Sequence, residues 1–497
     1  MSSTALPPTA VFDTKDQMDH VEDGKAPAEI GRLREFDPAL MRRATRKLDL
    51  LLLPILTAVY CCSSLDKSNL GNAKTLGMIK DIGGDPSGDR YALLNAFYFI
   101  SYAPFMVPLA LLGKRTRMAM VLSICAIFWG IAATSFAAVT NFPGSFACRF
   151  FVGLGEAGFS PLIQVYLSRF YTRRALGSRV AFWLAMAPMG GFINGIVAYG
   201  VAFIHSNKLA SWRILFLIEG LATVLLGVVA LIILPEDIAR CRWLKDDEKD
   251  YLQYQRSLSM APESHEINWN HARGVLYRWQ QLLPVFMNLC QQITGAALSA
   301  FLPTLISENG FEGATAQIAT LGPYGAAVVC MILASWISDR ILNRGWPTQF
   351  GWWIMVVAFA IYLAVPSTNH QARFAALVLA ETGHYICTPL IVTWAANNAG
   401  SESRRAVAVP LAVSCAQAVA AGSGYLFPAK DSPRYMMGSA VCLALSAAGS
   451  VFTLIYQGLI RWENKRRDAH EGGKPEPGFI PDTASFADDA PGFRYLN

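Results

Sequence analysis

The chain has 497 residues, of which 53% are hydrophobic and only 16% are charged, and its formal net charge is +6. An ordinary soluble domain carries roughly 25% charged residues. This composition therefore excludes a typical soluble globular protein and favours one that lies in a lipid bilayer.

Apolar runs recur along most of the chain. A helix needs about 20 mostly apolar residues to cross the hydrocarbon core of a bilayer. Runs of this length predict spans at about 48–66, 91–112, 118–139, 145–168, 179–204 and 213–234, and again at about 280–305, 315–338, 350–366, 373–395, 406–428 and 435–460. We therefore predict an all-α membrane protein with twelve transmembrane helices in two six-helix halves.

The polar stretches between and around these runs define the expected domains. Residues 48–234 form the first half and residues 279–460 the second. The stretch 235–278 contains an acidic cluster and no long apolar run, so it is expected to be a soluble linker. The tails 1–47 and 461–497 are rich in polar residues, proline and glycine, a composition typical of disorder.

Basic residues in the short loops predict the orientation. Cytoplasmic loops of membrane proteins carry an excess of Lys and Arg. Such residues gather after the second, fourth, eighth and tenth runs: Lys114, Arg115, Arg117, Arg169, Arg173, Arg174, Arg179, Arg340, Arg344, Arg404 and Arg405. Both termini and the linker are thus expected in the cytoplasm. The positive net charge is explained by this bias, so it does not indicate nucleic-acid binding.

The fourth run contains two charged residues on one helical face. Arg149, Gly153, Glu156 and Ser160 follow an i, i+4, i+7, i+11 spacing. An ionised side chain at the bilayer centre costs roughly 2.5 to 3.5 kcal/mol, so such residues usually face a protein interior or a water-filled path. We expect Arg149 to meet an anionic substrate or Glu156 to carry a proton. The alternative is that each forms a structural ion pair with another helix.

The tenth run offers a second candidate, because Glu381, His384 and Thr388 share one helical face. A buried carboxylate and imidazole can both change charge near neutral pH, which favours a proton relay. The alternative for His384 is a hydrated side chain near an outer helix end. In the seventh run, Gln291 and Gln292 can either hydrogen-bond a ligand or join two helices.

Other charged residues in the runs are expected to have structural roles. Asp66 and Lys67 are adjacent at the outer end of the first run, where a salt bridge or a snorkelling side chain is cheap. Asp49 and Glu219 are expected to pair with nearby bases. The ten cysteines show no disulfide or metal-site spacing, and no metal or other cofactor is expected.

The segment ISDRILNRG, residues 337–345, resembles the loop motif of the major facilitator superfamily. This resemblance implies that Asp339 and Arg340 are the acid and base that latch the cytoplasmic side. The corresponding loop of the first half, LLGKRTRMAM, lacks the acidic residue.

A closer resemblance is to the fungal anion:cation symporters, the allantoate permease family. Five segments carry it: LDKSNLGNAKTLGM, CRFFVGLGEAGFSP, FLPTLISENGF, TWAANNAGSESRRAVAVPL and YLFPAKDSPRY. The resemblance implies that small organic anions are taken up with protons. It also implies that Arg149 and Glu156 face the central path, and that Asn397, Asn398 and Arg405 lie at the cytoplasmic gate.

The sequence therefore predicts a proton-coupled secondary transporter and not an enzyme. Its partners would be a small organic anion, protons and the lipid bilayer, and it would act as a monomer in the plasma membrane. A vacuolar location is not distinguished from this one. Two alternatives are an exporter of a metabolite made by the same cell and a nutrient receptor that binds its ligand without transport.

Overall fold

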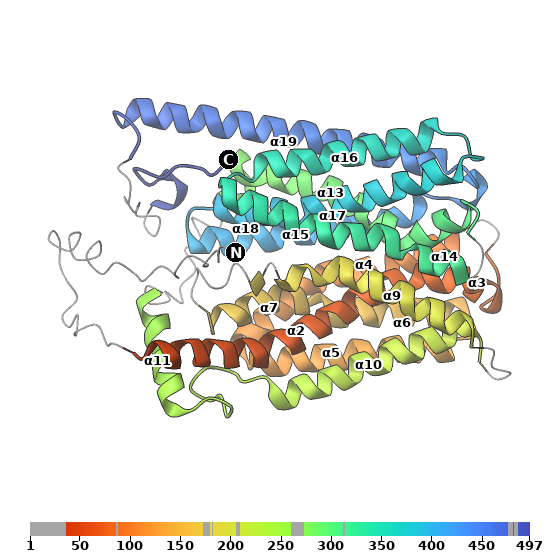
Figure 1. The fold of residues 1–497 in the computed structure, drawn as a ribbon, viewed down its shortest axis with the longest axis horizontal. Helices are drawn as coiled ribbons and strands as arrows, with labels where there is room; N and C mark the ends of the chain where they lie inside the picture. The colour runs from red at the N-terminus through yellow and green to blue at the C-terminus, as the bar shows by residue number, and fades with distance from the viewer. Residues whose placement is uncertain are drawn as a thin grey trace, which may run out of the picture.

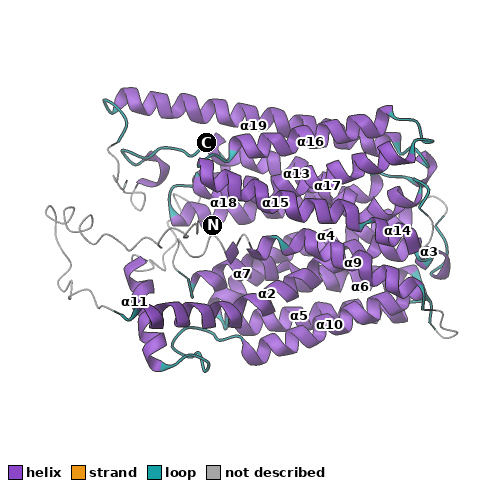
Figure 2. Cartoon of the chain, viewed as in Figure 1, coloured by secondary structure: helices purple, strands orange, loops and turns teal. Residues whose placement is uncertain are grey.

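The computed structural model describes residues 36–85, 88–171, 179–180, 182–204, 209–259, 273–311, 314–475, 481 and 486–497. Over these residues the regular structure is helical throughout, with no strand (Figure 2). Twelve helical segments are long and apolar enough to cross a membrane, which confirms the predicted number of spans.

The first half contains the first six spans. Its fourth span is built from two consecutive helices that meet at Gly158, and its fifth begins at Phe182. The elements are α2 (Pro38–Thr75), α3 (Met78–Asp81), α4 (Asp89–Arg115), α5 (Met118–Ser135), η1 (Phe136–Ala138), α6 (Phe142–Ala157), α7 (Phe159–Ser168), α9 (Met186–Ala202) and α10 (Ser211–Ile233).

The linker and the second half follow. The linker contains α11 (Asp246–Ser259) and η2 (Gly274–Leu276). The second half contains α13 (Trp279–Ser307), α14 (Ala314–Ala319), α15 (Leu321–Ile341), α16 (Gly345–Ala364), α17 (His370–Asn397), α18 (Glu402–Ala420), η3 (Ala421–Tyr425), η4 (Ala429–Asp431) and α19 (Met436–His470), and η5 (Ala487–Asp489) lies near the chain end.

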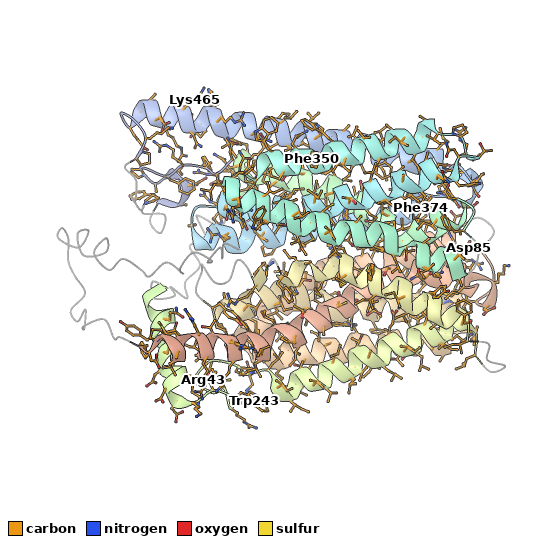
Figure 3. The ribbon with its side chains drawn as sticks, viewed as in Figure 1. Arg43, Asp85, Trp243, Phe350, Phe374 and Lys465 are labelled. Carbon is orange, nitrogen blue, oxygen red and sulfur yellow. The ribbon has the colours of Figure 1, made fainter. Side chains whose placement is uncertain are left out.

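Polar residues at the loop ends start several of these helices. The side chain of Asn141 accepts a hydrogen bond from Gly144 N at 2.9 Å at the start of α6, and Asn369 does the same for Ala372 N at 3.2 Å at the start of α17. These contacts satisfy main-chain donors that a first helical turn leaves unpaired. Between such caps, large apolar side chains face outward, and Phe350 on α16 is 58% exposed (Figure 3).

Glycines allow close helix contacts inside each half. A Cβ atom on Gly155 of α6 would lie 2.8 Å from the Trp129 Cβ atom of α5. A Cβ atom on Gly153 would collide with Ser101 and with the main-chain carbonyl of Tyr98 in α4. Gly153 and Gly155 therefore let the fourth span lie close to α4 and α5.

The two halves lie side by side, and they are closer together at one end of the bundle than at the other (Figure 1). We call the end that carries α11 and residues 486–497 the linker side, and the end that carries α3 and α14 the far side. At the far side the halves are joined by hydrogen bonds from Tyr91 Oη to Ala300 O at 2.8 Å and from Asn95 Nδ2 to Ser423 Oγ at 3.2 Å. Toward the linker side the ribbons of the two halves separate (Figure 1).

Both tails were predicted to be disordered, but the described parts of them are helical or packed against helices. The helix α2 begins at Pro38, before the predicted start of the first span, because Arg43 and Lys47 pair with the buried Glu248 of α11. At the other end α19 continues to His470, with Lys465 on this extension (Figure 3), and residues 486–497 pack against it. Residues 1–35, which belong to the same predicted N-terminal tail, lie outside the described residues.

Candidate substrate and proton site

Arg149 is buried in the first half, with 3% of its surface exposed. Its Nη1 atom donates a hydrogen bond to the main-chain carbonyl oxygen of Asp66 in α2 at 3.1 Å, and its Nε atom has no partner. Among the described residues, no carboxylate oxygen lies within 4.0 Å of its guanidinium nitrogens. Among the described residues this buried cation thus has no ion-pair partner, and its role in binding substrate stays a prediction.

Glu156 lies on the same helix face and is 1% exposed. Its Oε2 atom accepts hydrogen bonds from Ser63 Oγ and Tyr98 Oη, both at 2.7 Å, whereas its Oε1 atom has no partner. The groups that hold this carboxyl group are neutral hydroxyls from α2 and α4. Within the described part of the chain, Glu156 likewise forms no ion pair.

Lys67 is a central residue that the sequence analysis assigned to the outer interface. Because α2 continues to Thr75, Lys67 lies inside the bundle, where it is half-buried and its Nζ atom is 5.6 Å from the centroid of the Tyr102 ring. Of the two roles considered for Asp66 and Lys67, the salt bridge does not form among the described residues. Tyr60, Ser64 and Lys67 are spaced i, i+4, i+7 in the sequence. This spacing could have predicted that Lys67 lies on a polar face of the first helix.

Glu219 and Asp49 are the two carboxylates that were expected to pair with bases. Glu219 of α10 is 4% exposed and receives a short hydrogen bond from Asn69 Nδ2 of α2. The expectation that a base pairs with Glu219 is therefore wrong, because an amide takes that place. By contrast, the expected partner of Asp49 is present: Arg179 Nε and Nη2 donate to its two carboxylate oxygens, both at 2.8 Å.

A row of asparagines fixes α2 against α9. Asn72 Nδ2 donates to Asn194 Oδ1 at 2.7 Å, and Asn194 Nδ2 donates to Ser68 Oγ at 2.6 Å and to Leu65 O at 3.1 Å. Neutral amides of this kind join helices where water is absent. They give the charged residues on α2 a defined position.

In the second half, Gln291, His384 and Thr388 come together. Gln291 Nε2 donates to Thr388 Oγ1 at 2.5 Å and lies 3.1 Å from His384 Nδ1. His384 is 7% exposed, so the alternative of a hydrated histidine near an outer helix end is wrong. A Cβ atom on Gly295 would overlap the imidazole ring, which shows that α13 leaves room for it.

Glu381 and Gln292 lie near this cluster but are not part of its hydrogen bonding. Glu381 is 1% exposed, and the described residues provide it with no hydrogen-bond or ion-pair partner. It lies one helical turn before Tyr385, whose ring is 6.4 Å from that of Tyr324 in α15. Gln292 is half-buried and makes no side-chain hydrogen bond to the part of the chain that is described.

The residues assigned to a gate lie on the linker side of the second half. Asn398 follows the last residue of α17 and is fully buried, and its amide nitrogen donates to Tyr456 Oη at 3.1 Å and to Leu496 O at 3.0 Å. Arg405 Nε donates to Ala396 O at 2.9 Å, and Asn397 is exposed. The sequence analysis missed the contact with Leu496, because it treated the C-terminal stretch as disordered.

Asp339 and Arg340, the acid and base of the predicted latch, make local contacts at the end of α15, and their role as a latch stays a prediction. Asp339 pairs with Arg344 in the same loop, and the Arg340 guanidinium lies 4.8 Å from the centroid of the Trp336 ring. Both residues are exposed at the end of α15. Arg344 lies at the start of α16, close enough to pair with the Asp339 carboxylate.

Comparison with known proteins identifies relatives over nearly the whole chain. Residues 56–424 match the Major Facilitator Superfamily. The uncharacterized transporter C1039.04 of Schizosaccharomyces pombe is 29% identical over 88% of this chain and 87% of its own. The high-affinity nicotinic acid transporter of Saccharomyces cerevisiae is 28% identical over 92% of this chain and 85% of its own.

Solved structures of similar fold are also transporters. A D-xylose-proton symporter matches with a TM-score of 0.63 at 15% identity, covering 82% of this chain and 97% of that one. A bacterial homologue of the human lysosomal transporter Spinster, in an inward-facing and unoccupied conformation, matches with a TM-score of 0.62 at 16% identity, covering 85% and 96%. The chain belongs to the Major Facilitator Superfamily and is a multi-pass membrane transporter with the fold of that family, not an enzyme.

Proposed function

We propose that this protein imports a small organic anion together with protons by alternating access, as expected for a member of the fungal anion:cation symporters. The observation that carries the proposal is the buried Arg149, whose guanidinium bonds a main-chain carbonyl and has no carboxylate within 4.0 Å among the described residues. A buried cation is costly unless a partner neutralises it. In this proposal the carboxylate of the substrate pairs with Arg149.

The chemistry of the first half supports an anionic substrate. Arg149 and Lys67 provide two positive charges, from α6 and α2, near the neutral hydroxyls of Ser63 and Tyr98. A guanidinium can bind a carboxylate through two parallel hydrogen bonds, which gives geometric selectivity. The similarity to a nicotinic acid transporter favours an aromatic or heterocyclic monocarboxylate as the substrate class.

Buried carboxyl groups without basic partners support the coupling to protons. Glu156 and Glu381 are each 1% exposed, and neither forms an ion pair among the described residues. Burying a charge of this kind is expensive, so a change in its surroundings during the transport cycle favours proton uptake or release. We propose that one of them, or His384 beside Gln291, carries the proton.

The charge distribution of the loops supports an orientation. The described basic residues after the second, fourth, eighth and tenth runs lie at the linker side, which we assign to the cytoplasm, whereas Arg173 and Arg174 lie outside the described residues. The hydrogen bonds that join the halves at the far side, with the separation of their ribbons toward the linker side (Figure 1), support an inward-open conformation, and we propose that transport proceeds by rocking of the two halves around a site near the middle of the membrane. We further propose that the protein acts as a monomer in the plasma membrane.

The direct test is uptake of labelled small carboxylates into cells that lack their own permeases. The panel includes pyridine carboxylates, ureido acids and vitamin-like acids, each at acidic and neutral external pH. The proposal expects one compound to accumulate, and to accumulate faster at acidic pH. Faster loss of a compound from preloaded cells would instead indicate an exporter, and binding without net flux would indicate a receptor.

A further inference from the structure

The C-terminal segment, residues 486–497, lies against the linker-side ends of the second half (Figure 1). Its Asp488 side chain is 0% exposed. Asp488 Oδ1 pairs with Arg278 Nη1 at 3.1 Å and with Arg404, and Oδ2 accepts a hydrogen bond from Tyr495 Oη at 2.8 Å. A buried carboxylate thus joins the start of α13 to the start of α18.

Leu496, near the end of the segment, binds the turn between α17 and α18 from its α17 side. Leu496 N donates to Asn398 Oδ1 at 2.8 Å, and Asn398 Nδ2 returns a hydrogen bond to Leu496 O at 3.0 Å. Trp394 Nε1 also donates to Leu496 O, at 2.8 Å. The turn between α17 and α18 is therefore held on both sides.

Gly400, within this turn, has the shape that the contact requires. Its φ angle is +64°, a conformation that favours glycine, and a Cβ atom there would lie 2.5 Å from Asp488 N. Any larger residue would displace the segment. The turn and the segment are thus complementary at the main-chain level.

The polar end of α19, residues 461–470, also contacts the segment 486–497. Arg467 Nη1 donates to Asp488 O at 2.5 Å and to Phe493 O at 3.3 Å, and its guanidinium lies 4.8 Å from the centroid of the Tyr495 ring. Asn464 forms two hydrogen bonds with the main chain of Tyr495, at 2.9 and 3.0 Å. These contacts explain why α19 continues to His470.

The held turn is the tip of a helical hairpin that contains two prolines. Pro389 lies inside α17 and Pro410 lies inside α18. A proline inside a helix removes one main-chain hydrogen bond and favours a bend at that point. The part of the hairpin between them, residues 389–410, is thus able to move relative to the rest of the half.

We propose that the segment 486–497 is a clamp that holds the tip of this hairpin against α13 and α19 and favours the conformation in which the linker side is open. The clamp binds the position of the hairpin seen here, in which the halves separate toward the linker side (Figure 1). A group that binds one of two conformations more tightly shifts the population toward that conformation, by as much as its affinities for the two conformations differ. Closing the linker side then requires the clamp to loosen, whatever the substrate is.

The test measures the separation of the two halves in the purified full-length protein. Spin labels replace the exposed residues Thr116, which follows α4, and Ile341, at the end of α15, in a variant without its ten native cysteines. Loss of a charge-assisted hydrogen bond changes an equilibrium by about tenfold or more. We expect Asp488→Asn, and a chain that ends at residue 485, to lower the ratio of long to short distances by about that factor.

Two controls make the result specific. Asp489→Asn removes the neighbouring carboxylate, which also pairs with Arg278 but is 55% exposed, so the ratio should stay within about twofold of that of the parent. Adding a peptide of residues 486–497 to the shortened chain should restore the long distances. If the shortened chain does not fold, Asp488→Asn alone carries the test. Unchanged distances in Asp488→Asn, a shift toward longer ones, or an equal effect of Asp489→Asn would overturn the proposal.

Discussion

Arg149 contacts Asp66 through the main chain: its Nη1 atom donates to the Asp66 carbonyl oxygen at 3.1 Å, while the Asp66 Oδ2 atom has no hydrogen-bond partner among the described residues. Two oppositely charged side chains are therefore close in the bundle without forming an ion pair. The arrangement leaves the guanidinium able to bind an anion that enters from the central path.

The first prediction concerns this guanidinium. Removing a hydrogen bond to a charged group costs about 1.5 to 3 kcal/mol, so Arg149→Gln should lower the uptake rate at low substrate concentration by roughly 10- to 150-fold. Arg213→Gln is the matched control, because Arg213 also donates to one main-chain carbonyl, Ala137 O at 2.7 Å, but lies at the start of α10. Equal uptake by the two variants at equal surface amounts would contradict the role of Arg149.

The second prediction concerns the proton carriers. Glutamine keeps the shape of glutamate but takes up no proton near neutral pH, so Glu156→Gln or Glu381→Gln should make uptake independent of external pH. The measurement is initial uptake at several external pH values for each variant and the parent. A pH dependence that persists in both variants would show that neither carboxyl group couples protons to transport.

The third prediction tests the close packing of the fourth span. A Cβ atom on Gly153 would meet the Tyr98 main chain, so Gly153→Ala should destabilise the purified protein by about 1 to 3 kcal/mol. Gly200 in α9 has no neighbouring atom within 4 Å of such a Cβ atom, and Gly200→Ala should be neutral or slightly stabilising. Thermal unfolding in detergent compares the two, and a lower unfolding temperature for Gly200→Ala than for Gly153→Ala would contradict the packing described.

The fourth prediction concerns pH and the linker helix α11. Burial acts to raise the pKa of Glu248, but the hydrogen bonds from Lys47 and Lys245 N, with the charge of Arg43, lower it below its ordinary value of 4.5. A lowered pKa in the folded state means that the carboxylate stabilises the contact above pH 4.5 and that this stabilisation is lost as the pH falls through the lowered pKa.

Amide hydrogen exchange in residues Asp246–Ser259 measures this contact. Exchange should become faster, relative to an unstructured peptide at the same pH, as the pH falls below 4.5, and Glu248→Gln should exchange faster already at neutral pH. Asp246→Asn is the control, because the Asp246 side chain is 97% exposed and its ion pair with Lys249 stays within α11 and does not reach α2. Exchange in Glu248→Gln that matches the parent at neutral pH would contradict the contact.

Much of the fold could be predicted because the bilayer imposes a simple rule on the sequence. Each span must be a long apolar helix, and run lengths alone predicted the twelve spans that the structure contains. The same rule identified Arg149, Glu156 and Glu381 as buried, because a charge in an apolar run is exceptional. Spacing also predicted that His384 and Thr388 share one face of their helix, and both side chains lie next to Gln291.

What the sequence could not provide is which partner each buried group meets. Lys67 was assigned to an interface because the apolar run ends before the helix does, and hydropathy does not detect a polar helical end. Asn69 and Glu219 are 150 residues apart in the chain, so their contact depends on how the helices pack. The C-terminal segment is polar, but its order comes from the buried Asp488 and its arginine partners, not from an apolar pattern.

Uptake into liposomes by the purified protein is the measurement that tests the central claim most directly. The vesicles contain either the parent or Arg149→Gln, and the labelled carboxylate identified in cells is supplied with an inward proton gradient. The account predicts accumulation by the parent above the outside concentration, its collapse when a protonophore removes the gradient, and little accumulation by Arg149→Gln. Uptake that is indifferent to the gradient, or that Arg149→Gln supports as well as the parent, would contradict a proton-coupled anion site built around Arg149.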